Sequence, residues 1–374
     1  MRLSVNSPLF KDAVNKIISV VDKKNPRPIL TSCLVTAANN QVSLSASDIE
    51  VSALITMEAK VDIEGHFCII AKNFSEIIKE LPNDDIQLEL DPESNKQILK
   101  LDCKGVHYTL LVNDSNEFPQ LNFLKDSDPY FSIQARSLQN MIQKVSHAIC
   151  LLETRPGLNG IFLQSIEGDL RGVATDAHRL GLYNIIHFKE SNAFLEEGVT
   201  LPRKGVHEIK KLVDAYGDQD IKINVSESHI KLKAMNNYFI TVRLMSYDFP
   251  NYQSVLPTKI LYEMIVNKMA FITALKRVKI LANEKSNRIY LNLSLNKLII
   301  TVTNASFGGA MEEMDVKYDG RAVDISINAK YLLEALAVLE DEEISFHFNH
   351  ELSPIIIKGV DDPYFVAVIM PLQN

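Results

Sequence analysis

Thr175-Asp176-Ala177, near the middle of the chain, belongs to a motif that occurs three times. Its counterparts are Ser47-Asp48-Ile49 and Thr303-Asn304-Ala305, so a small hydroxyl-bearing residue precedes Asp or Asn each time. The central positions 48, 176 and 304 are 128 residues apart in both intervals. A fixed period of this length indicates an internal repeat, and the 374 residues of the chain hold three such units.

A proline-containing segment recurs at a similar depth in each unit. The three segments are Glu117-Phe118-Pro119-Gln120-Leu121, Asp248-Phe249-Pro250-Asn251-Tyr252 and Ile369-Met370-Pro371-Leu372. Their prolines are 131 and 121 residues apart. Together the two motifs predict three domains, with the bounds 1–124, 125–256 and 257–374.

Each unit also shows two amphipathic patterns with helical period, the second preceded by a short strand. The predicted helices are Leu9–Val21 and Phe74–Leu81 in the first unit, Leu138–Ile149 and Val206–Ala215 in the second, and Ala270–Ala282 and Tyr331–Leu339 in the third. Alternating apolar residues with tight turns, as in 221–233 and 291–302, indicate antiparallel strands. The predicted fold class is therefore α+β, with two helices packed on antiparallel sheets three times over. No Gly/Ser-rich linker separates the units, which predicts that they are joined edge to edge.

The composition is that of a globular protein, with 46% hydrophobic and 23% charged residues. It excludes a disordered chain, a collagen and a disulfide scaffold. The formal net charge of −8 argues against a protein that coats nucleic acid with its whole surface. The four cysteines, Cys33, Cys68, Cys103 and Cys150, form no CxxC pair, which favours buried thiols in a reducing compartment. Met1 begins an alternating strand-like pattern and the apolar runs are short, so we expect a cytoplasmic protein without a membrane span.

The positive charge is concentrated in the predicted helices. It lies in residues 268–288 and in the pairs Arg203-Lys204, Lys210-Lys211 and Lys23-Lys24. The acidic residues gather instead in turns and strands. A basic helical face suits the phosphate backbone of nucleic acid. Lysines that are merely solvated on amphipathic helices explain the same pattern, and the residues alone leave both interpretations open.

One constellation, Asp176 with His178 and Arg179, has residue types found in catalysis. On a strand, residues two apart face the same side, so Asp176 and His178 are placed to hydrogen-bond each other. The sequence shows no nucleophile or third metal ligand beside them, and no phosphate-binding loop or hydrolase motif. A structural or partner-binding role is favoured, while an enzyme centred on these three residues and a scaffold that binds only proteins remain the alternatives.

Five motifs together resemble the bacterial DNA polymerase III beta subunits, the sliding clamps. They are Glu153-Thr154-Arg155-Pro156-Gly157-Leu158-Asn159-Gly160, Thr175-Asp176-Ala177-His178-Arg179-Leu180, Leu201-Pro202-Arg203-Lys204-Gly205, Tyr247-Asp248-Phe249-Pro250-Asn251-Tyr252 and Asn283-Glu284-Lys285. The resemblance extends from Met1 to Asn374 with the motifs in order. It implies three clamp domains per chain and a head-to-tail homodimer closed into a ring, with helices around the hole and sheets outside. Such a ring encircles duplex DNA without sequence preference, slides along it and tethers the polymerase, with no catalysis, no metal and no cofactor.

The resemblance also implies three sets of functional residues. The DNA-binding set is Lys23, Lys24, Lys72, Arg155, Arg203 and Lys204. The site for short hydrophobic peptides has one side at Leu158, Thr175, Ala177, His178, Arg179, Leu180, Pro250 and Val255, and the other at Asn328, Tyr331, Leu352, Pro354, Val368, Ile369, Met370, Pro371 and Leu372. The dimer interface places Lys72, Ile77, Ile78, Tyr108 and Leu110 against Ile280, Leu281, Glu312 and Glu313. The implied partners are double-stranded DNA, a second copy of the chain, the replicative polymerase alpha subunit, the clamp-loader complex, and repair and translesion polymerases, mismatch-repair proteins and ligase.

Overall fold

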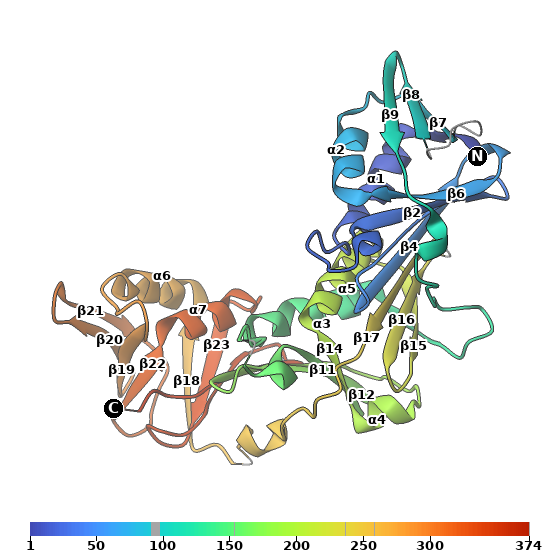
Figure 1. Cartoon of the computed structure of the whole chain (residues 1–374). Coiled ribbons are helices and arrows are strands. Elements are labelled where there is room, and N and C mark those ends of the chain that lie inside the picture. Colours follow the sequence, from blue (N-terminus) through green and yellow to red (C-terminus); the bar gives the residue numbers. More distant parts are fainter. Residues whose placement is uncertain (91–97, 153, 236, 258, 374) are drawn as a thin grey trace. The chain divides into compact units, whose positions relative to one another are not determined.

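The structure is a computed structural model that describes residues 1–90, 98–152, 154–235, 237–257 and 259–373. Its internal contacts divide the chain into two compact units. The first unit consists of Met1–Gln139 and Lys204–Leu244, and the second of Asn140–Arg203 and Met245–Asn374. Both units are built from helices that pack on antiparallel sheets (Figure 1).

The first unit contains a five-stranded and an eight-stranded sheet. In spatial order the smaller sheet is β5 (Lys60–Ile63), β1 (Arg2–Asn6), β7 (Asp85–Leu90), β8 (Ile98–Cys103) and β9 (Val106–Leu111). The larger sheet is β10 (Phe131–Gln134), β15 (Asp220–Val225), β16 (His229–Ala234), β17 (Tyr238–Arg243), β4 (Val51–Glu58), β3 (Gln41–Ser47), β2 (Ser32–Ala38) and β6 (Gly65–Ile70).

The second unit contains an eight-stranded and a four-stranded sheet. The larger sheet is β14 (Val199–Pro202), β11 (Gly160–Ile166), β12 (Asp169–Thr175), β13 (Arg179–Ile185), β25 (Phe365–Ile369), β24 (Ile355–Gly359), β23 (Glu343–Phe348) and β18 (Tyr262–Asn267). The smaller sheet is β21 (Gly308–Asp315), β20 (Lys297–Asn304), β19 (Arg288–Ser294) and β22 (Val323–Asn328).

Each eight-stranded sheet joins strands from two different thirds of the sequence. In the first unit β17 pairs with β4, with Val242 opposite Val51. In the second unit β25 pairs with β13, with Ile369 opposite Arg179. The predicted edge-to-edge joining is therefore confirmed at both junctions, and so is the α+β class with antiparallel sheets.

Six helices occupy the positions predicted from the amphipathic patterns. They are α1 (Ser7–Ile18), α2 (Ala71–Glu80), α3 (Ala135–Val145), α5 (Arg203–Tyr216), α6 (Lys268–Lys279) and α7 (Ala329–Ala337). Each begins two or three residues before the predicted start, because the prediction begins at the first apolar residue whereas the helix begins at its cap. Asn6, Asn267 and Asn328, for example, cap α1, α6 and α7 by accepting from backbone N–H groups of the first turn. The sequence patterns missed one short helix, α4 (Ala193–Glu197).

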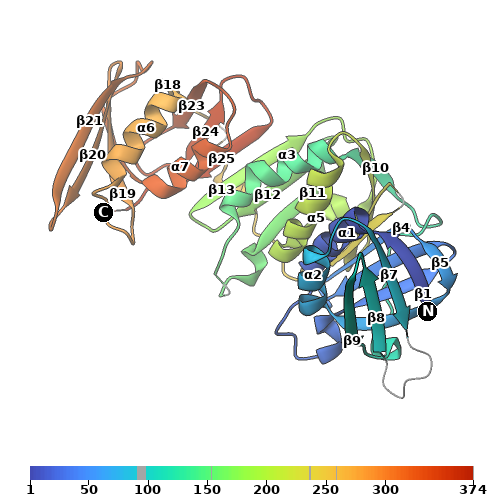
Figure 2. The same cartoon turned by 90° about the horizontal axis from the view of Figure 1, so that it is seen from above.

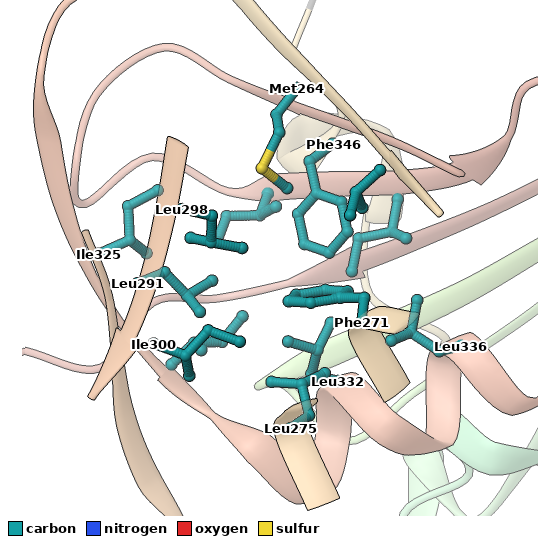
Figure 3. Packing of buried hydrophobic residues seen from close by; sticks show 14 of the residues in the cluster. Met264, Phe271, Leu275, Leu291, Leu298, Ile300, Ile325, Leu332, Leu336 and Phe346 are labelled. Atoms are coloured by element: carbon teal, nitrogen blue, oxygen red, sulfur yellow. The ribbon is translucent and has the colours of Figure 1, made fainter. Parts of the chain in front are cut away.

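In the first unit α1 and α2 pack side by side, and α1 also contacts β1, β3 and β4 (Figure 2). In the second unit α6 and α7 pack on each other, and their apolar faces meet side chains from both sheets (Figure 3). Phe271 of α6 meets Phe346 of β23 edge to face at 5.4 Å between ring centroids. Burying one such aromatic side chain contributes roughly 1.5–3 kcal/mol. This core fixes the helices relative to the sheets and hence positions the surface residues between them.

The 3₁₀ turns complete the described elements. They are η1 (Pro28–Thr31), η2 (Ser115–Glu117), η3 (Ser146–Ala148), η4 (Pro156–Leu158) and η5 (Tyr252–Val255).

Candidate functional site

The motif Asp176-Ala177-His178 forms a tight turn between β12 and β13 in the second unit. The Asp176 carboxylate accepts hydrogen bonds from the backbone N–H groups of His178 at 2.9 Å and Arg179 at 3.0 Å. Thr175 Oγ1 accepts from the Ala177 N–H at 3.1 Å, and Ala177 has a positive φ of 73°. The expected strand with Asp176 bonded to the His178 side chain is therefore wrong, because the side chain of Asp176 satisfies the backbone of a turn.

Arg179 connects this turn to helix α7. Its Nε donates to Asp176 Oδ2 at 3.0 Å, and its Nη1 donates to the carboxylate of Glu334. The guanidinium lies 4.3 Å from the ring centroid of Tyr331, and only 9% of the side chain is exposed. Two carboxylates and an aromatic ring thus hold Arg179 in one position, while His178 beside it stays exposed.

An apolar cluster lies beside the turn, under η5. Its buried members are Val173, Leu180, Leu182, Tyr252, Ile356 and Val368, and Phe162, Phe249, Val255, Leu256 and Val366 pack on it half-buried. We call this set the Leu180 cluster. The rings of Phe162 and Phe249 stack at 4.8 Å, which ties the Phe249-Pro250 segment to β11. The cluster brings Leu180, Val255 and Val368 of the predicted peptide site together.

The C-terminal segment runs along the same turn. The Met370 N–H donates to the His178 carbonyl at 2.9 Å, and the Leu372 N–H donates to the Ser326 carbonyl at 2.7 Å. Met370, Pro371 and Leu372 are half-buried. This edge of the predicted peptide site is therefore formed by an anchored segment of chain.

Other predicted peptide-site residues are placed differently. Ile369 packs in the core around Phe271 because side chains alternate along β25, so its predicted place in the site is wrong. Asn328 is buried and caps α7, with its side chain accepting from the N–H groups of Lys330 and Tyr331. Leu158 is half-buried in η4, whereas Pro250 and Leu352 are exposed and Pro354 is half-buried just before β24.

The predicted DNA-binding cations fall into two groups. Lys23, Lys24, Lys72 and Arg203 are exposed, and none has an ion pair within the part of the chain that the structure describes. Arg155 is exposed too and donates to the Asp176 carbonyl at 3.3 Å. Lys204 differs, since its Nζ donates to the Val20 carbonyl at 2.9 Å and pairs with the Asp48 carboxylate. Its role in DNA contact stays a prediction, and in this structure its charge is paired within the first unit.

The predicted interface residues lie on two end strands, β9 and β21, and on or just after helices α2 and α6. Tyr108 and Leu110 are half-buried on β9, the last strand of the five-stranded sheet, and Ile77 is half-buried on α2. Ile78 is fully buried within the first unit, so its predicted contact with a partner is wrong. Glu312 and Glu313 lie on β21, the last strand of the four-stranded sheet, where they pair with Arg277 and Lys297.

Three exposed apolar residues near these edges were missed. Leu111 of β9 is 70% exposed, Met311 of β21 is 71% exposed, and Phe307, just before β21, is 76% exposed. They resemble Ile280, predicted at the interface, which is 79% exposed at the end of α6. The sequence shows that these residues are apolar, but it does not show that their strands lie at the ends of sheets. Their exposure could therefore not be predicted.

Among the described residues, no group of three or more His, Cys, Asp or Glu could hold a metal ion. Burial raises the pKa of the Cys33 and Cys68 thiols to about 12, which keeps both protonated. No helix in the described part of the chain is long and apolar enough to cross a membrane.

Three family models match consecutive parts of the chain. They are the N-terminal, central and C-terminal domains of the DNA polymerase III beta subunit, over residues 1–122, 132–251 and 253–373. Among relatives, the beta sliding clamps of Caulobacter vibrioides and Pseudomonas aeruginosa are each 28% identical over the full length of both chains. The crystal structure of the DNA polymerase III subunit beta from Pseudomonas aeruginosa matches all of both chains with a TM-score of 0.93 and 27% identity.

The threefold α+β repeat on antiparallel sheets thus defines a clamp-type protein. The chain belongs to the DNA polymerase III beta subunit family, the beta sliding clamps, and has the three-domain clamp fold. Members of this family are processivity factors of DNA polymerase III and not enzymes, which decides against an enzyme centred on Asp176, His178 and Arg179. The family implies DNA and polymerase as partners.

Proposed function

We propose that two copies of this chain close head to tail into a ring that encircles duplex DNA. Each copy contributes three domains, 1–124, 125–256 and 257–374. The observation that carries the proposal is that β9 in the first unit and β21 in the second are end strands of their sheets. An uncovered edge presents unpaired N–H and C=O groups to another chain. Pairing of β9 with the β21 of a partner uses both edges of each copy, so that a dimer closes on itself.

Exposed apolar side chains at these edges support the same pairing. Leu111 on β9, and Met311 with Phe307 at β21, expose more than two-thirds of their surfaces. Monomeric proteins rarely leave several large apolar side chains uncovered along an open edge. Burial of these residues between two copies is a source of dimer stability in addition to the backbone hydrogen bonds.

The experiment is sedimentation of the purified chain with two matched substitutions. The proposal expects a mass of twice 42.1 kDa for the unmodified chain and a monomer for Leu111→Lys, because the lysine would be buried without a partner. Ile63→Lys is the control, since Ile63 is 53% exposed on β5, the opposite edge of the same sheet. A Leu111→Lys chain that stays dimeric, or an unmodified chain that is monomeric, contradicts the β9–β21 interface.

The proposed DNA contacts are Lys23, Lys24, Lys72, Arg155 and Arg203. The lack of ion pairs around four of them in the described residues supports this assignment, because their charges remain available to phosphates. Lys204 is a sixth proposed contact, and its ammonium pairs with the Asp48 carboxylate in this structure. The contacts are to the backbone of DNA and therefore allow sliding at any sequence.

The proposed docking site for partner peptides is the surface over the Leu180 cluster. Its half-buried rim at Val255, Met370 and Leu372 offers apolar contacts, and the fixed Arg179 and exposed His178 offer polar ones. Such a surface suits short segments with apolar anchors. The proposed owners of these segments are the replicative polymerase alpha subunit, the clamp-loader complex, repair and translesion polymerases, mismatch-repair proteins and ligase, all of them in the cytoplasm.

A further inference from the structure

The turn at Asp176 has a structural counterpart at Asp48 in the first unit. The Asp48 carboxylate accepts from the N–H groups of Glu50 at 3.1 Å and Val51 at 2.8 Å, and Ser47 Oγ accepts from the Ile49 N–H at 3.2 Å. Ile49 has a φ of 85°, as Ala177 has 73°. The same hydrogen bonds thus build the same turn at the end of β3 and at the end of β12.

The strand that follows each turn pairs with an equivalent neighbouring strand. The Arg243 N–H donates to the Glu50 carbonyl at 2.8 Å, as the Met370 N–H donates to the His178 carbonyl at 2.9 Å. The two strand pairs, β4–β17 and β13–β25, have the same register relative to their turns. The junction in the first unit therefore repeats the backbone frame of the proposed peptide site.

A cavity of about 270 Å³ occupies this place in the first unit. It lies between the Asp48 turn, the ends of β16 and β17, and the Pro119–Asn122 segment that corresponds to the Pro250 segment. A cavity of this size is smaller than the usual cleft for a cofactor or nucleotide, and it holds one or two side chains. Ile49 at its edge is 50% exposed, which offers an apolar contact.

The cavity has the opposite chemistry to its counterpart. In the Leu180 cluster, Val368 lies between its strand partners Ile356 and Leu180. At the equivalent place in the first unit, Thr241 lies between its strand partners Lys231 and Ser52. Arg27 and His229 also line the cavity, and Glu50 is its one acidic residue among those described. Burial, with Arg243 and Lys231 nearby, lowers the pKa of His229, which shows that cations crowd this end of the sheet.

We propose that this cavity, between the Asp48 turn and Lys231, is a second docking site that takes an acidic, extended peptide segment. The cationic lining is complementary to carboxylate side chains. Lys231 Nζ forms a long ion pair with Asp128, at 3.8 Å, and donates to Asn122 Oδ1 at 3.0 Å, which is its one hydrogen bond among the described residues. A partner carboxylate therefore gains a close contact. The apolar Ile49 favours a peptide side chain over a phosphate backbone. The extended shape of the ligand rests on the proposed peptide site at the Leu180 cluster, whereas its charge rests on the cavity alone.

The test uses the full chain with labelled isoleucine methyl groups and follows them by NMR. The probe is the acetylated, amidated tetrapeptide Glu-Val-Glu-Val, and Lys-Val-Lys-Val is its charge control. The expected result is a saturable shift of the Ile49 methyl signal with the acidic peptide only. The signal of Ile356, the counterpart of Lys231, is expected to stay in place.

Two substitutions locate the binding. Lys231→Met and the exposed Arg27→Ala are each expected to weaken the acidic peptide about tenfold through loss of a charge-assisted contact. His178→Ala, the control at the equivalent turn, is expected to leave its affinity unchanged. Arg27→Ala keeps the test valid if Lys231→Met impairs folding.

Three results of the experiments with peptides overturn the proposal. They are an unsaturated or absent Ile49 shift, an equal shift with the basic peptide, and an affinity unchanged by both substitutions. A shift of Ile49 with a short DNA duplex but not with the acidic peptide assigns the cavity to DNA and also overturns it. None of these results bears on ring closure, which sedimentation tests separately.

Discussion

At the scale of single residues, His147 is a buried base that the native state keeps neutral. Its Nδ1–H donates to the Lys144 carbonyl at 2.9 Å, and its ring meets Phe365 edge to face at 6.2 Å. Burial, and secondly the charge of Arg179, lower its pKa to about 4. In the unfolded chain the imidazole has its ordinary pKa of about 6.5. Between pH 6.5 and pH 4, therefore, the unfolded state binds a proton at this histidine and the native state does not.

The native state should therefore lose stability as the pH falls from about 6.5 to about 4. The expected loss from His147 is about 3 kcal/mol in the free energy of unfolding, since each pKa unit corresponds to about 1.4 kcal/mol. Urea unfolding at a series of pH values measures it, and His147→Gln should flatten the curve. His229 and His347 have lowered pKa values too and leave a residual slope of the same sign. An unchanged slope in His147→Gln would exclude His147 as a source, and the exposed His207→Gln serves as the control.

Arg179 should not be replaceable by lysine. A single ammonium cannot reach Asp176 and Glu334 together and also cover the Tyr331 ring. We expect Arg179→Lys to lower the free energy of unfolding by about 1–3 kcal/mol and to weaken a peptide with Leu and Phe anchors about tenfold. Urea unfolding and peptide titration check the two effects.

The matched control is Arg136→Lys, since Arg136 forms one exposed pair with Asp218 in the first unit. It should change neither quantity measurably. Peptide affinity that survives Arg179→Lys would remove Arg179 from the peptide site.

At the scale of elements, the Phe249-Pro250 segment depends on a glycine far from it in sequence. Gly198 ends α4 with a φ of 100°, and a Cβ there would lie 2.1 Å from the ring of Phe162, which stacks on Phe249. Gly198→Ala should therefore displace both rings and move the segment that lies over the Leu180 cluster.

Gly168→Ala separates this clash from backbone strain. Gly168 has a φ of 83°, but its Cβ would meet no atom within 4 Å. We expect both variants to lose about 1 kcal/mol from strain, and Gly198→Ala to lose about 1–3 kcal/mol more and to bind peptide more weakly. Equal unfolding free energies of the two variants would show that Phe162 adapts without cost.

Periodicity predicts the elements well because it reflects local rules. The stripe of Leu138, Met141, Ile142 and Val145 follows from one helix burying one face, and all four side chains are buried. Pairings between distant segments leave no such trace. The packing of the helices decides, for example, that Lys204 pairs with Asp48 and that Ile78 of α2 is buried. The resemblance to known clamps therefore predicts a region for the site, yet it cannot tell a surface residue from a buried neighbour.

At the scale of the whole molecule, an acidic chain that binds DNA must do so through topology more than attraction. With a net charge of −8 the chain as a whole repels the duplex, and we propose that exposed cations such as Lys24 and Arg203 attract it locally. A closed ring needs little attraction, because it can leave only over a DNA end.

The chain, loaded by its clamp loader, should therefore remain on a circular plasmid at a salt concentration that abolishes ordinary phosphate contacts, and linearisation should release it. Gel filtration of the labelled chain with plasmid before and after cutting measures this. On linear DNA, Lys24→Glu with Arg203→Glu should lower the logarithmic salt slope of binding by about two, one for each lost contact. Lys60→Glu, at the exposed end of β5, is the matched control. If the chain leaves the uncut circle at the same salt concentration at which it leaves linear DNA, then charge, and not a closed ring, holds this protein on its template.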